Sequence, residues 1–515
     1  MTNSINKIVI VGGGSAGWLC ANILAKKLNL KNNNELSIQL IESPDIPIIG
    51  VGEGTVPAIR DTLKLIEISE TEFIRECDAT FKQSINFIDW LRPQNNAISH
   101  SYHHLFSYPQ TPGFDLLPYW LKSEKQICFA DAVSFQSSLC QLGKAPKKIT
   151  TPEFKGIADY AYHLNAGKFA KLLEKHAVQH FGVEHLSSKV IDVDIAEDGN
   201  IRQLTTDSKG IICGDFFIDC SGFSSLLLGK SLNVPFKDKG DVLFVDSALA
   251  IQQPYPELNS PIPSHTISTA KEAGWIWDIG LSSRRGIGYV YSSSHTTENE
   301  AEKCLSQYLN LKDDVEFRKI PMRIGYREKF WENNCVALGL SAGFVEPLEA
   351  TALLLVEASC KMLADIFPST KQAIPSAAKR FNSTLEYGWE RVVDFIKLHY
   401  YLSDRIDSDF WRDNRDKSSV PNSLLEKLEL WKFQPPSEYD FPSRYEIFGL
   451  ENYQYVLYGM NYFTDISKSL HDYPNQAIAD NMFTQIQTKT KEIQSALLTN
   501  RELLDKIYRY GLPKN

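Results

Sequence analysis

Hydrophobic residues follow two different patterns along this chain. In the first part, strand-like runs, such as residues 36–41 and 216–220, alternate with stretches of helical spacing such as residues 169–176. The first part of the chain is therefore predicted to be an α/β sheet with helices between its strands.

Helical periodicity dominates the second part. Residues 351–367 and 377–402 carry apolar positions at helical spacing, and charged residues occupy the other faces: Glu357, Lys361 and Arg391. These segments are predicted to be amphipathic helices, not membrane spans. Residues 433–442 are rich in proline and aromatic side chains, which fits either a pocket wall or a connector. A last helix is predicted from about residue 477 to 508.

Composition indicates a large soluble enzyme of two or more modules. The chain has 515 residues, and its net charge of −9 argues against nucleic acid or an anionic membrane as a general partner. Its nine cysteines form no C-x-x-C pair and no cluster typical of zinc, so we expect reduced thiols and no metal site. The first strand begins at about Lys7, which leaves no room for a secretory signal ahead of it. A cytoplasmic protein is predicted.

A glycine-rich motif follows the first strand. The sequence Gly12-Gly13-Gly14-Ser15-Ala16-Gly17 comes directly after the apolar run that starts at Lys7, and Glu42 ends the next strand-like run. Glycines at these positions let the backbone turn tightly and approach a pyrophosphate, which the N–H groups of a helix start then bind. An acidic residue at the end of the second strand accepts hydrogen bonds from a ribose. An ordinary glycine turn remains the alternative, but this context favours a dinucleotide site.

Six further motifs carry a family resemblance over nearly the whole chain. They are residues 49–57, which include Gly52 and Glu53; Thr80-Phe81-Lys82; Phe217-Ile218-Asp219-Cys220-Ser221-Gly222-Phe223; Gly274-Trp275-Ile276-Trp277; Val336-Ala337-Leu338-Gly339; and residues 343–351. In this order the set resembles the flavin-dependent tryptophan halogenases and their wider family. The resemblance implies that FAD is the dinucleotide, with Gly12, Gly14, Ser15, Ala16, Gly17, Glu42, Gly52, Glu53, Leu338 and Gly339 at the cofactor.

The same resemblance implies a fold and a division of the chain. The fold class is α/β (α+β), a Rossmann-like FAD-binding fold of the flavoprotein monooxygenase type with a mainly helical C-terminal module. Residues 1–350 are expected to form the FAD-binding module with an interleaved sheet region, and its substrate-facing segments are about 82–150 and 235–330. Residues 351–515 are expected to complete the substrate pocket.

The resemblance also assigns the chemistry. Reduced FAD and O₂ convert a halide ion, bromide or chloride, to hypohalous acid, which travels through an internal tunnel to Lys82. Glu349 is expected to face Lys82, and the backbone N–H groups of Thr351 and Ala352 are expected to contact the halide. On the residues alone, Lys82 would be a solvated lysine and Glu349 would equally well cap the helix that begins near Thr351. The family often has serine and glycine where this chain has Ala350 and Ala352.

Two tryptophans are expected to separate the flavin from the organic substrate. Trp275 and Trp277 resemble the family's W-x-W-x-I-P signature, but Gly280 stands where proline is usual. Two indoles beside a flavin would keep the substrate from the flavin-bound oxidant and so prevent direct hydroxylation. Core packing is the alternative role for both side chains.

The substrate pocket departs from that of the enzymes that act on free tryptophan. His104 and Phe106 match an H-x-F element that lines the aromatic pocket, with His103 as the alternative register. Phe448 and Tyr453 are expected to line it as well. Aligned on Phe448, the chain has Arg444 and Gly449 where those enzymes have glutamate and tryptophan, although Glu446 permits a shifted register. A simple indole or another electron-rich aromatic is therefore predicted as the substrate.

Two rival functions stay open from the sequence: a flavin-dependent aromatic monooxygenase and a non-catalytic flavin-binding protein. Lys82, Glu349 and the tryptophan pair favour halogenation. No nicotinamide-binding pattern is evident in the sequence, so a separate flavin reductase is expected to supply FADH₂. Faster bromination than chlorination is expected, and the oligomeric state is left open, with a homodimer as one alternative.

Overall fold

The computed structural model describes residues 4–45, 50, 52–94, 98–123, 127–311, 315–469 and 471–514. The chain forms two compact units, each assembled from three segments. Unit 1 comprises Met1–Asp78, Leu164–Lys239 and Arg323–Trp389, and unit 2 comprises Ala79–His163, Gly240–Met322 and Glu390–Asn515. The expected boundary at residue 350 falls within the third segment of unit 1.

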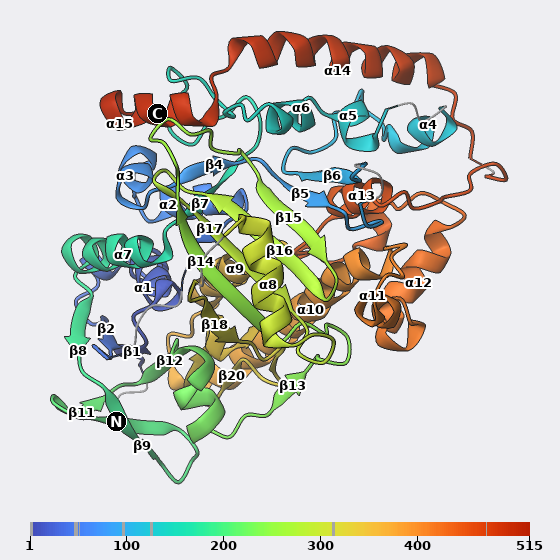
Figure 1. The fold of residues 1–515 in the computed structure, drawn as a ribbon. Coiled ribbons are helices and arrows are strands. Elements are labelled where there is room, and N and C mark those ends of the chain that lie inside the picture. The colour runs from blue at the N-terminus through green and yellow to red at the C-terminus, as the bar shows by residue number, and fades with distance from the viewer. Residues whose placement is uncertain are drawn as a thin grey trace. The chain divides into compact units, whose positions relative to one another are not determined.

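Unit 1 is built on a six-stranded sheet with β1 near its centre (Figure 1). Across the sheet the strands are β20 (Trp331–Glu332), β21 (Cys335–Ala337), β12 (Phe216–Asp219), β1 (Lys7–Val11), β2 (Ser37–Glu42) and β8 (Glu184–Ser187). All neighbours are parallel except β20 and β21. The apolar runs predicted at the first two strands and at β12 are confirmed. This is the expected parallel sheet of a Rossmann-like fold.

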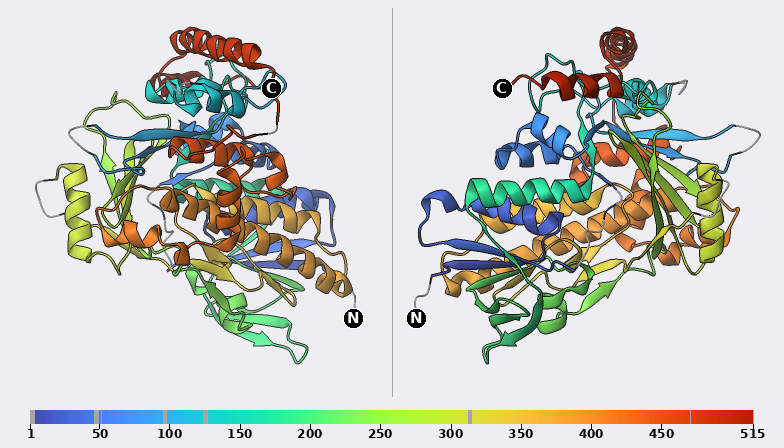
Figure 2. Two further views of the ribbon diagram at one scale, coloured as in Figure 1. Left: turned by 90° about the vertical axis from the view of Figure 1, so that its right-hand side faces the viewer. Right: turned by 60° about the vertical axis from the view of Figure 1, so that its left-hand side comes forward.

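Helices cover this sheet, and short strands extend the unit. The helices are α1 (Ser15–Lys27), α2 (Ala58–Leu65), α3 (Glu70–Glu76), α7 (Ala166–Phe181), α9 (Thr351–Asp365) and the first part of α10 (Ile374–Tyr401). The remaining strands are β3 (Glu53–Gly54), β9 (Val190–Ile195), β10 (Ile201–Thr206), β11 (Gly210–Cys213), β13 (Phe236–Asp238), β19 (Gly325–Arg327) and β22 (Gly343–Phe344). Helix α1 packs against both α7 and α9, and Figure 2 shows α1 and α7 running side by side.

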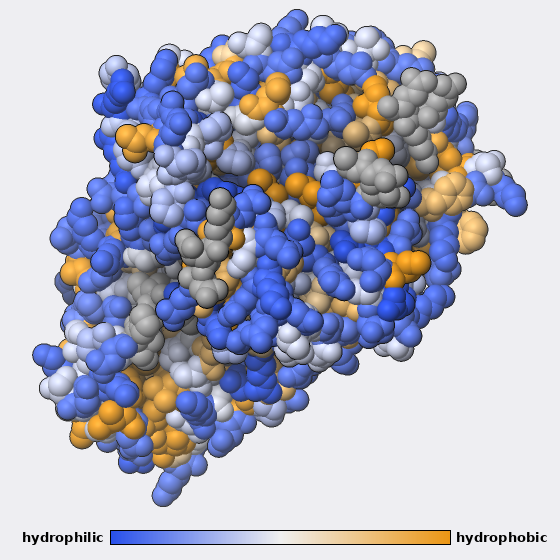
Figure 3. All heavy atoms as spheres, in the orientation of Figure 1, coloured by the Kyte–Doolittle hydropathy of each residue, from blue (hydrophilic) through white to orange (hydrophobic). Residues whose placement is uncertain are grey.

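Hydrophilic side chains predominate on the face shown in Figure 3, with hydrophobic ones among them.

Unit 2 contains a seven-stranded sheet that is mostly antiparallel. Its order is β18 (Arg318–Pro321), β14 (Ser247–Pro254), β17 (Arg284–Tyr291), β16 (Gly274–Gly280), β15 (Thr266–Lys271), β5 (Ser84–Ile88) and β6 (Ser101–Leu105). Helix α8 (Glu298–Leu309) packs on β14 and β17. The core between this helix and the sheet includes Leu249, Ile287 and Leu305, each 0% exposed. A separate strand, β4 (Thr80–Lys82), pairs antiparallel with β7 (Ala161–Leu164).

The other helices of unit 2 come after the strands of the sheet in the sequence, or between two of these strands in the sequence. They are α4 (Leu117–Lys122), α5 (Phe129–Val133), α6 (Gln136–Gln141), α11 (Asp409–Asn414), α12 (Asn422–Trp431), α13 (Leu450–Gly459), α14 (Gln476–Ala496) and α15 (Asn500–Tyr510). The single last helix predicted from about 477 to 508 is wrong, because the chain forms two helices there. Thr499 caps α15 in a capping box with Glu502, a signal that the apolar periodicity does not contain.

The predicted helices at 351–367 and 377–402 are confirmed as α9 and α10, and the stretch at 169–176 lies within α7. The proline-rich segment at 433–442 contains only the short turn of helix Glu438–Asp440. None of the described helices is long and apolar enough to cross a membrane.

Candidate active site

The glycine-rich turn after β1 is shaped by the absence of side chains. A Cβ atom on Gly12 would lie 2.1 Å from the carbonyl oxygen of Cys220, and one on Gly17 would lie 1.9 Å from the carbonyl oxygen of Gly12. A Cβ atom on Gly14 would meet no atom within 4 Å. Gly12 and Gly17 therefore let the chain close on itself, while Gly14 faces open space.

Helix α1 begins directly after this turn. Gly14 is its N-cap and supplies no side-chain hydrogen bond, and the first turn, which contains Ser15, Ala16 and Gly17, holds no acidic residue. The first N–H groups of a helix have no partner inside the helix and attract anions. The turn and the helix start therefore fit a pyrophosphate, and the missing Cβ atom of Gly14 lets it approach.

Glu42 ends β2 and lies over this turn. Its carboxyl carbon is 2.1 Å from the place of a Cβ atom on Gly13, so a side chain at Gly13 would displace it. Burial raises the pKa of Glu42, while His185 and the indole N–H of Trp18 lower it. The side chain of Glu42 is 27% exposed, so a ligand in front of the turn can reach the carboxylate. This arrangement fits the predicted contact with a ribose.

The predicted segment at 49–57 is described in part. Ile49 and Val51 lie outside the described residues. Gly52 has a φ of 137°, in the region that favours glycine. Burial raises the pKa of the neighbouring Glu53 to about 7. Glu53 is therefore a carboxyl group whose protonation changes near neutral pH.

The Leu338-Gly339 segment lies against the start of α1. The N–H of Leu338 donates to the carbonyl oxygen of Asp219 at 2.9 Å. Gly339 has a φ of 63°, and a Cβ atom on it would lie 2.8 Å from the Cβ atom of Ala16. Unit 1 thus brings together the glycine turn and this segment, which are more than 300 residues apart in the sequence.

The start of α9 has the features of an anion site. Ala350 is the N-cap, has a left-handed φ of 55° and supplies no side-chain hydrogen bond, and the first turn holds no acidic residue. The Thr351 hydroxyl is buried and has no hydrogen-bond partner within the described residues. Helix N–H groups and such a hydroxyl can donate to a halide. Ala352 is exposed, and Glu349 is 2% exposed.

Lys82 ends β4 in unit 2 and is 1% exposed. Its Nζ atom lies 5.1 Å from the centre of the Phe106 ring. Lysine is almost never fully buried without a special environment, and an aromatic face stabilises an ammonium group. The solvated surface role that the residues alone suggested for Lys82 is therefore wrong. Lys82 and Glu349 belong to different units, and their pairing stays a prediction.

Three buried histidines accompany Lys82 in unit 2. Burial lowers the pKa of His163 well below its usual value, and the charge of Lys82 lowers it further. Burial also lowers the pKa of His103, and it lowers that of His265 to about 4. The Nε2 atom of His163 lies 2.8 Å from the Thr266 hydroxyl. His163, beside Lys82, is therefore a neutral imidazole at neutral pH, and no pattern in the sequence indicated this.

The two predicted tryptophans differ in environment. Trp275 is 1% exposed, whereas Trp277 is partly exposed, and their rings meet edge to face with centres 6.4 Å apart. A Cβ atom on Gly288 would lie 2.1 Å from the Trp277 ring, so this glycine gives the indole its place on β17. Gly280, which stands in place of the usual proline, accepts a hydrogen bond from Thr80 at 2.5 Å. The strand of the tryptophans is thus bonded to the strand of Lys82.

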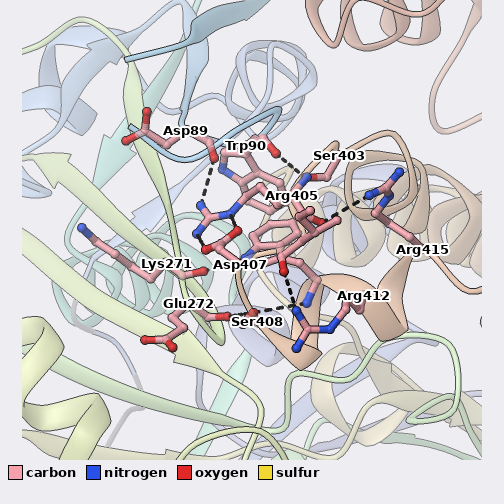
Figure 4. Close-up of polar contacts among 12 residues, drawn as sticks. Asp89, Trp90, Lys271, Glu272, Ser403, Arg405, Asp407, Ser408, Arg412 and Arg415 are labelled. Atoms are coloured by element: carbon pink, nitrogen blue, oxygen red, sulfur yellow. Dashed lines mark hydrogen bonds and ion pairs between the residues drawn. The ribbon is translucent and has the colours of Figure 1, made fainter. Parts of the chain in front are cut away.

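The segment that follows α10 is hydrogen-bonded to Asp89 and Trp90 (Figure 4). Arg405 donates to the carbonyl oxygen of Asp89 at 3.0 Å and to both carboxylate oxygens of Asp407. Trp90, next to Asp89, packs against Trp275 with ring centres 6.2 Å apart. The core-packing alternative therefore describes Trp275 well, and Trp277 is the indole that remains accessible.

Three residues of the predicted substrate pocket gather around Phe395. His104 lies 5.8 Å from the Phe395 ring, and Phe448 stacks on it at 4.0 Å between ring centres. Tyr453 lies 4.9 Å from the same ring. His104 is held by Asn452, whose side-chain oxygen is 3.0 Å from Nε2. His103 instead contacts the Ser84 hydroxyl at 2.9 Å, so His104 is the histidine on this aromatic cluster.

Gly449 is one of the positions at which the chain departs from the enzymes that act on free tryptophan. A neighbouring carboxylate occupies the space that a side chain at this position would need. A Cβ atom on Gly449 would lie 2.9 Å from an oxygen of Glu451. Burial raises the pKa of Glu451, and its carboxylate accepts from Asn452 at 2.8 Å. A tryptophan at position 449 would displace Glu451. Neither Glu451 nor Phe395 was predicted, because a carboxylate in a helix start and an apolar residue in a long helix are both ordinary features of sequence.

The sequence and fold match one family over most of the chain. Residues 7–476 match the tryptophan halogenase family. The chain belongs to this family. It is 36% identical over 478 residues to tryptophan 6-halogenase SttH of Streptomyces toxytricini, covering 88% of this chain and 89% of that protein. It is 31% identical to tryptophan 7-halogenase RebH of Lentzea aerocolonigenes, covering 98% and 99% of the two chains.

Solved structures agree with this membership. The crystal structure of a tryptophan halogenase from Shewanella frigidimarina superposes with a TM-score of 0.96 at 46% identity, covering 99% of each chain. BrvH, a flavin-dependent halogenase from Brevundimonas, superposes with a TM-score of 0.86 at 32% identity, covering 98% of this chain and all of that one. The expected fold class and family are confirmed, and the protein is an enzyme of the flavin-dependent halogenase family.

Proposed function

We propose that the protein halogenates an electron-rich, indole-like aromatic substrate in a reaction that depends on FADH₂, O₂ and a halide. Family membership supports the reaction type. The observation that carries the assignment for this chain is Lys82, a buried lysine that lies over the Phe106 ring and lowers the pKa of His163. A buried amine among neutral side chains suits the transfer of an electrophilic halogen better than a structural role.

The residues of unit 1 fit FAD. The open space in front of Gly14 and the N–H groups at the start of α1 suit the pyrophosphate, and Glu42 suits a ribose. We place Gly52, Glu53, Leu338 and Gly339 at the flavin end. Bound there as FADH₂, the cofactor would supply the two electrons that activate O₂, and O₂ is the oxidant that converts the halide to hypohalous acid. The start of α9, with Thr351 and Ala352, is the proposed halide contact.

Lys82 then presents the halogen to the substrate. Its N–H groups donate to the oxygen of hypohalous acid, or its neutral amine accepts the halogen. The halogen bonds to a ring carbon, the ring loses a proton, and the hydroxyl of hypohalous acid leaves as water. Glu349 is the proposed base for the ring proton. A neutral His163 beside Lys82 adds no competing charge to this step.

A simple indole suits the aromatic cluster better than free tryptophan. The named relatives include tryptophan 6-halogenase and tryptophan 7-halogenase, but this chain has Arg444 and Gly449 where enzymes for free tryptophan carry their glutamate and tryptophan. Glu451 occupies the space beside Gly449. We propose His104, Phe106, Trp277, Phe448 and Tyr453 as the side chains at the substrate, and a separate flavin reductase as the source of FADH₂. We place the protein in the cytoplasm.

An assay with reduced FAD, O₂ and a halide tests this function. Indoles, phenols and free tryptophan are each offered with bromide and with chloride, and products are identified by mass. We expect halogenated indoles, faster bromination than chlorination, and weak turnover of free tryptophan. Hydroxylated products would support a monooxygenase instead, and no turnover across the panel would support a non-catalytic flavin-binding protein. Sustained halogenation with NADH and oxidised FAD alone would contradict the need for a reductase.

A further inference from the structure

One histidine in unit 1 holds the acidic residue of the nucleotide site. His185 lies on β8, the strand next to β2, and its Nε2 atom is 3.3 Å from a carboxylate oxygen of Glu42. Its Nδ1 atom is 3.2 Å from a carboxylate oxygen of Glu174, on α7. His185 therefore bridges two carboxylates that come from different elements, and each of its ring nitrogens has one partner.

Trp18 completes this arrangement from α1. Its ring meets the His185 ring edge to face, with centres 5.0 Å apart, and its indole N–H donates to Glu42. Trp18 is 1% exposed and its position is set by the core. The Glu42 carboxylate is thus contacted from β8 and α1 and lies directly over Gly13. It cannot turn away from the glycine-rich turn without losing these contacts.

His185 and Glu42 are only partly buried. The side chains of His185 and Glu42 are 26% and 27% exposed, so the carboxylate is oriented and still open to a ligand. A carboxylate that accepts hydrogen bonds from a pair of vicinal hydroxyls binds them more tightly when it is already oriented, because binding then costs less conformational entropy.

We propose that His185 is a positioning residue that holds Glu42 for the adenosine ribose of the bound dinucleotide. This inference rests on the proposed FAD site. His185 acts through Glu42 and does not itself contact the nucleotide. Loss of its contact leaves Glu42 free to rotate away from the turn.

A pH dependence follows from the groups around Glu42. The titratable neighbours that face Glu42 are His185 on β8 and Glu174 on α7. Burial has the largest effect and raises the pKa of Glu42; His185 lowers this pKa, and Glu174 raises it. Ribose hydroxyls donate to the ionised carboxylate, so FAD affinity falls as the pH drops through the pKa of Glu42. Without His185 that pKa is higher, and the fall begins at a higher pH.

The test measures the dissociation constants of oxidised FAD and of FMN from the quenching of flavin fluorescence, as a function of pH. His185→Leu removes the contact, while His185→Gln keeps an N–H donor near the place of Nε2. His180→Leu is the matched control, because His180 makes a similar contact with Glu67, at 2.7 Å, on a different part of the same unit. Thermal unfolding of each variant shows whether it is folded.

We expect His185→Leu to weaken FAD binding about tenfold at neutral pH, the size of a hydrogen bond to a charged group. His185→Gln should recover most of this loss, and His180→Leu should bind FAD normally. FMN lacks the adenosine ribose, so its binding should not change. Unchanged FAD binding in His185→Leu, equal weakening of FAD and FMN, or an unshifted pH profile would overturn the inference. Failure of the unsubstituted protein to bind FAD would overturn the proposed function itself.

Discussion

The glycine turn after β1 and the surroundings of Lys82 are built in opposite ways. The turn is defined by missing side chains and the start of helix α1 within a stretch of six residues. Lys82 is defined by side chains that come from distant segments: Phe106 at its ammonium group, His163 on the partner strand β7, and Thr266 behind His163. The first site is local in the sequence, and the second exists only when the chain is folded.

This difference has a practical meaning for substitutions. In the turn, a single methyl group is enough to cause a clash, and its effect depends on which way the Cβ atom points. Around Lys82, the charge and hydrogen-bonding capacity of each side chain decide the outcome, since all of them are buried or partly buried. Variants of the two regions should therefore separate cofactor binding from chemistry.

Removal of the Lys82 amine should have the largest effect. Lys82→Met should lower halogenation by at least about 100-fold, the scale of a lost proton-transfer or nucleophilic group, and leave FAD binding intact. Lys147→Met is a matched control, because Lys147 is also fully buried and lies over an aromatic ring, Tyr160, at 5.4 Å. Product yield per folded molecule is measured for both. Equal losses in the two variants would remove the special role of Lys82.

Two alanine substitutions in the turn should differ from each other. Gly17→Ala places a Cβ atom 1.9 Å from the Gly12 oxygen, so it should destabilise the fold and weaken FAD binding by about 10- to 100-fold. Gly14→Ala meets no protein atom and should keep the melting temperature within about 2 °C. It should still weaken FAD binding about tenfold, because the methyl group enters the space proposed for the pyrophosphate. Normal FAD affinity of Gly14→Ala, measured by fluorescence, would exclude that placement.

The start of α9 combines backbone and side-chain donors. Thr351→Val removes a buried hydroxyl that has no partner within the described residues, so it should raise the KM for bromide and chloride about tenfold without loss of stability. Ser359→Ala on the same helix is the control, because that hydroxyl donates to the Leu355 carbonyl at 2.6 Å and should not affect halide use. A halide KM that does not change in Thr351→Val would place the halide elsewhere.

The smallest effect is expected at the N-cap of α9. Ala350 has a φ of 55°, which is unfavourable for any residue with a Cβ atom, so Ala350→Gly should stabilise the protein by about 1 kcal/mol. Ala352 lies in the first turn of the helix, so Ala352→Gly should destabilise the protein by about 0.5–1 kcal/mol. Chemical denaturation gives both values. Destabilisation by Ala350→Gly as well as by Ala352→Gly would show that the backbone conformation at Ala350 does not store this strain.

Much of unit 1 could be predicted from the sequence. The strand-like runs that form β1, β2 and β12 were visible in the sequence, and the turn between β1 and α1 uses residue types that fit few other conformations. The roles proposed for Gly12, Gly14, Gly17 and Glu42 rest on that local geometry. The break between α14 and α15 was missed, although the capping box of Thr499 and Glu502 was present.

The sequence by itself determined the glycine-rich turn, the amphipathic helices and the family, because each depends on residue types at short and regular spacing. Tertiary structure alone decided which segments form each unit and that Lys82 is buried. It also decided that Asn500 of α15 donates to the carbonyl oxygen of Phe81, the residue before Lys82, and that His185 contacts Glu42. These contacts join residues up to 419 positions apart. Their free energy comes from burial and pairing of groups that have no fixed spacing along the chain.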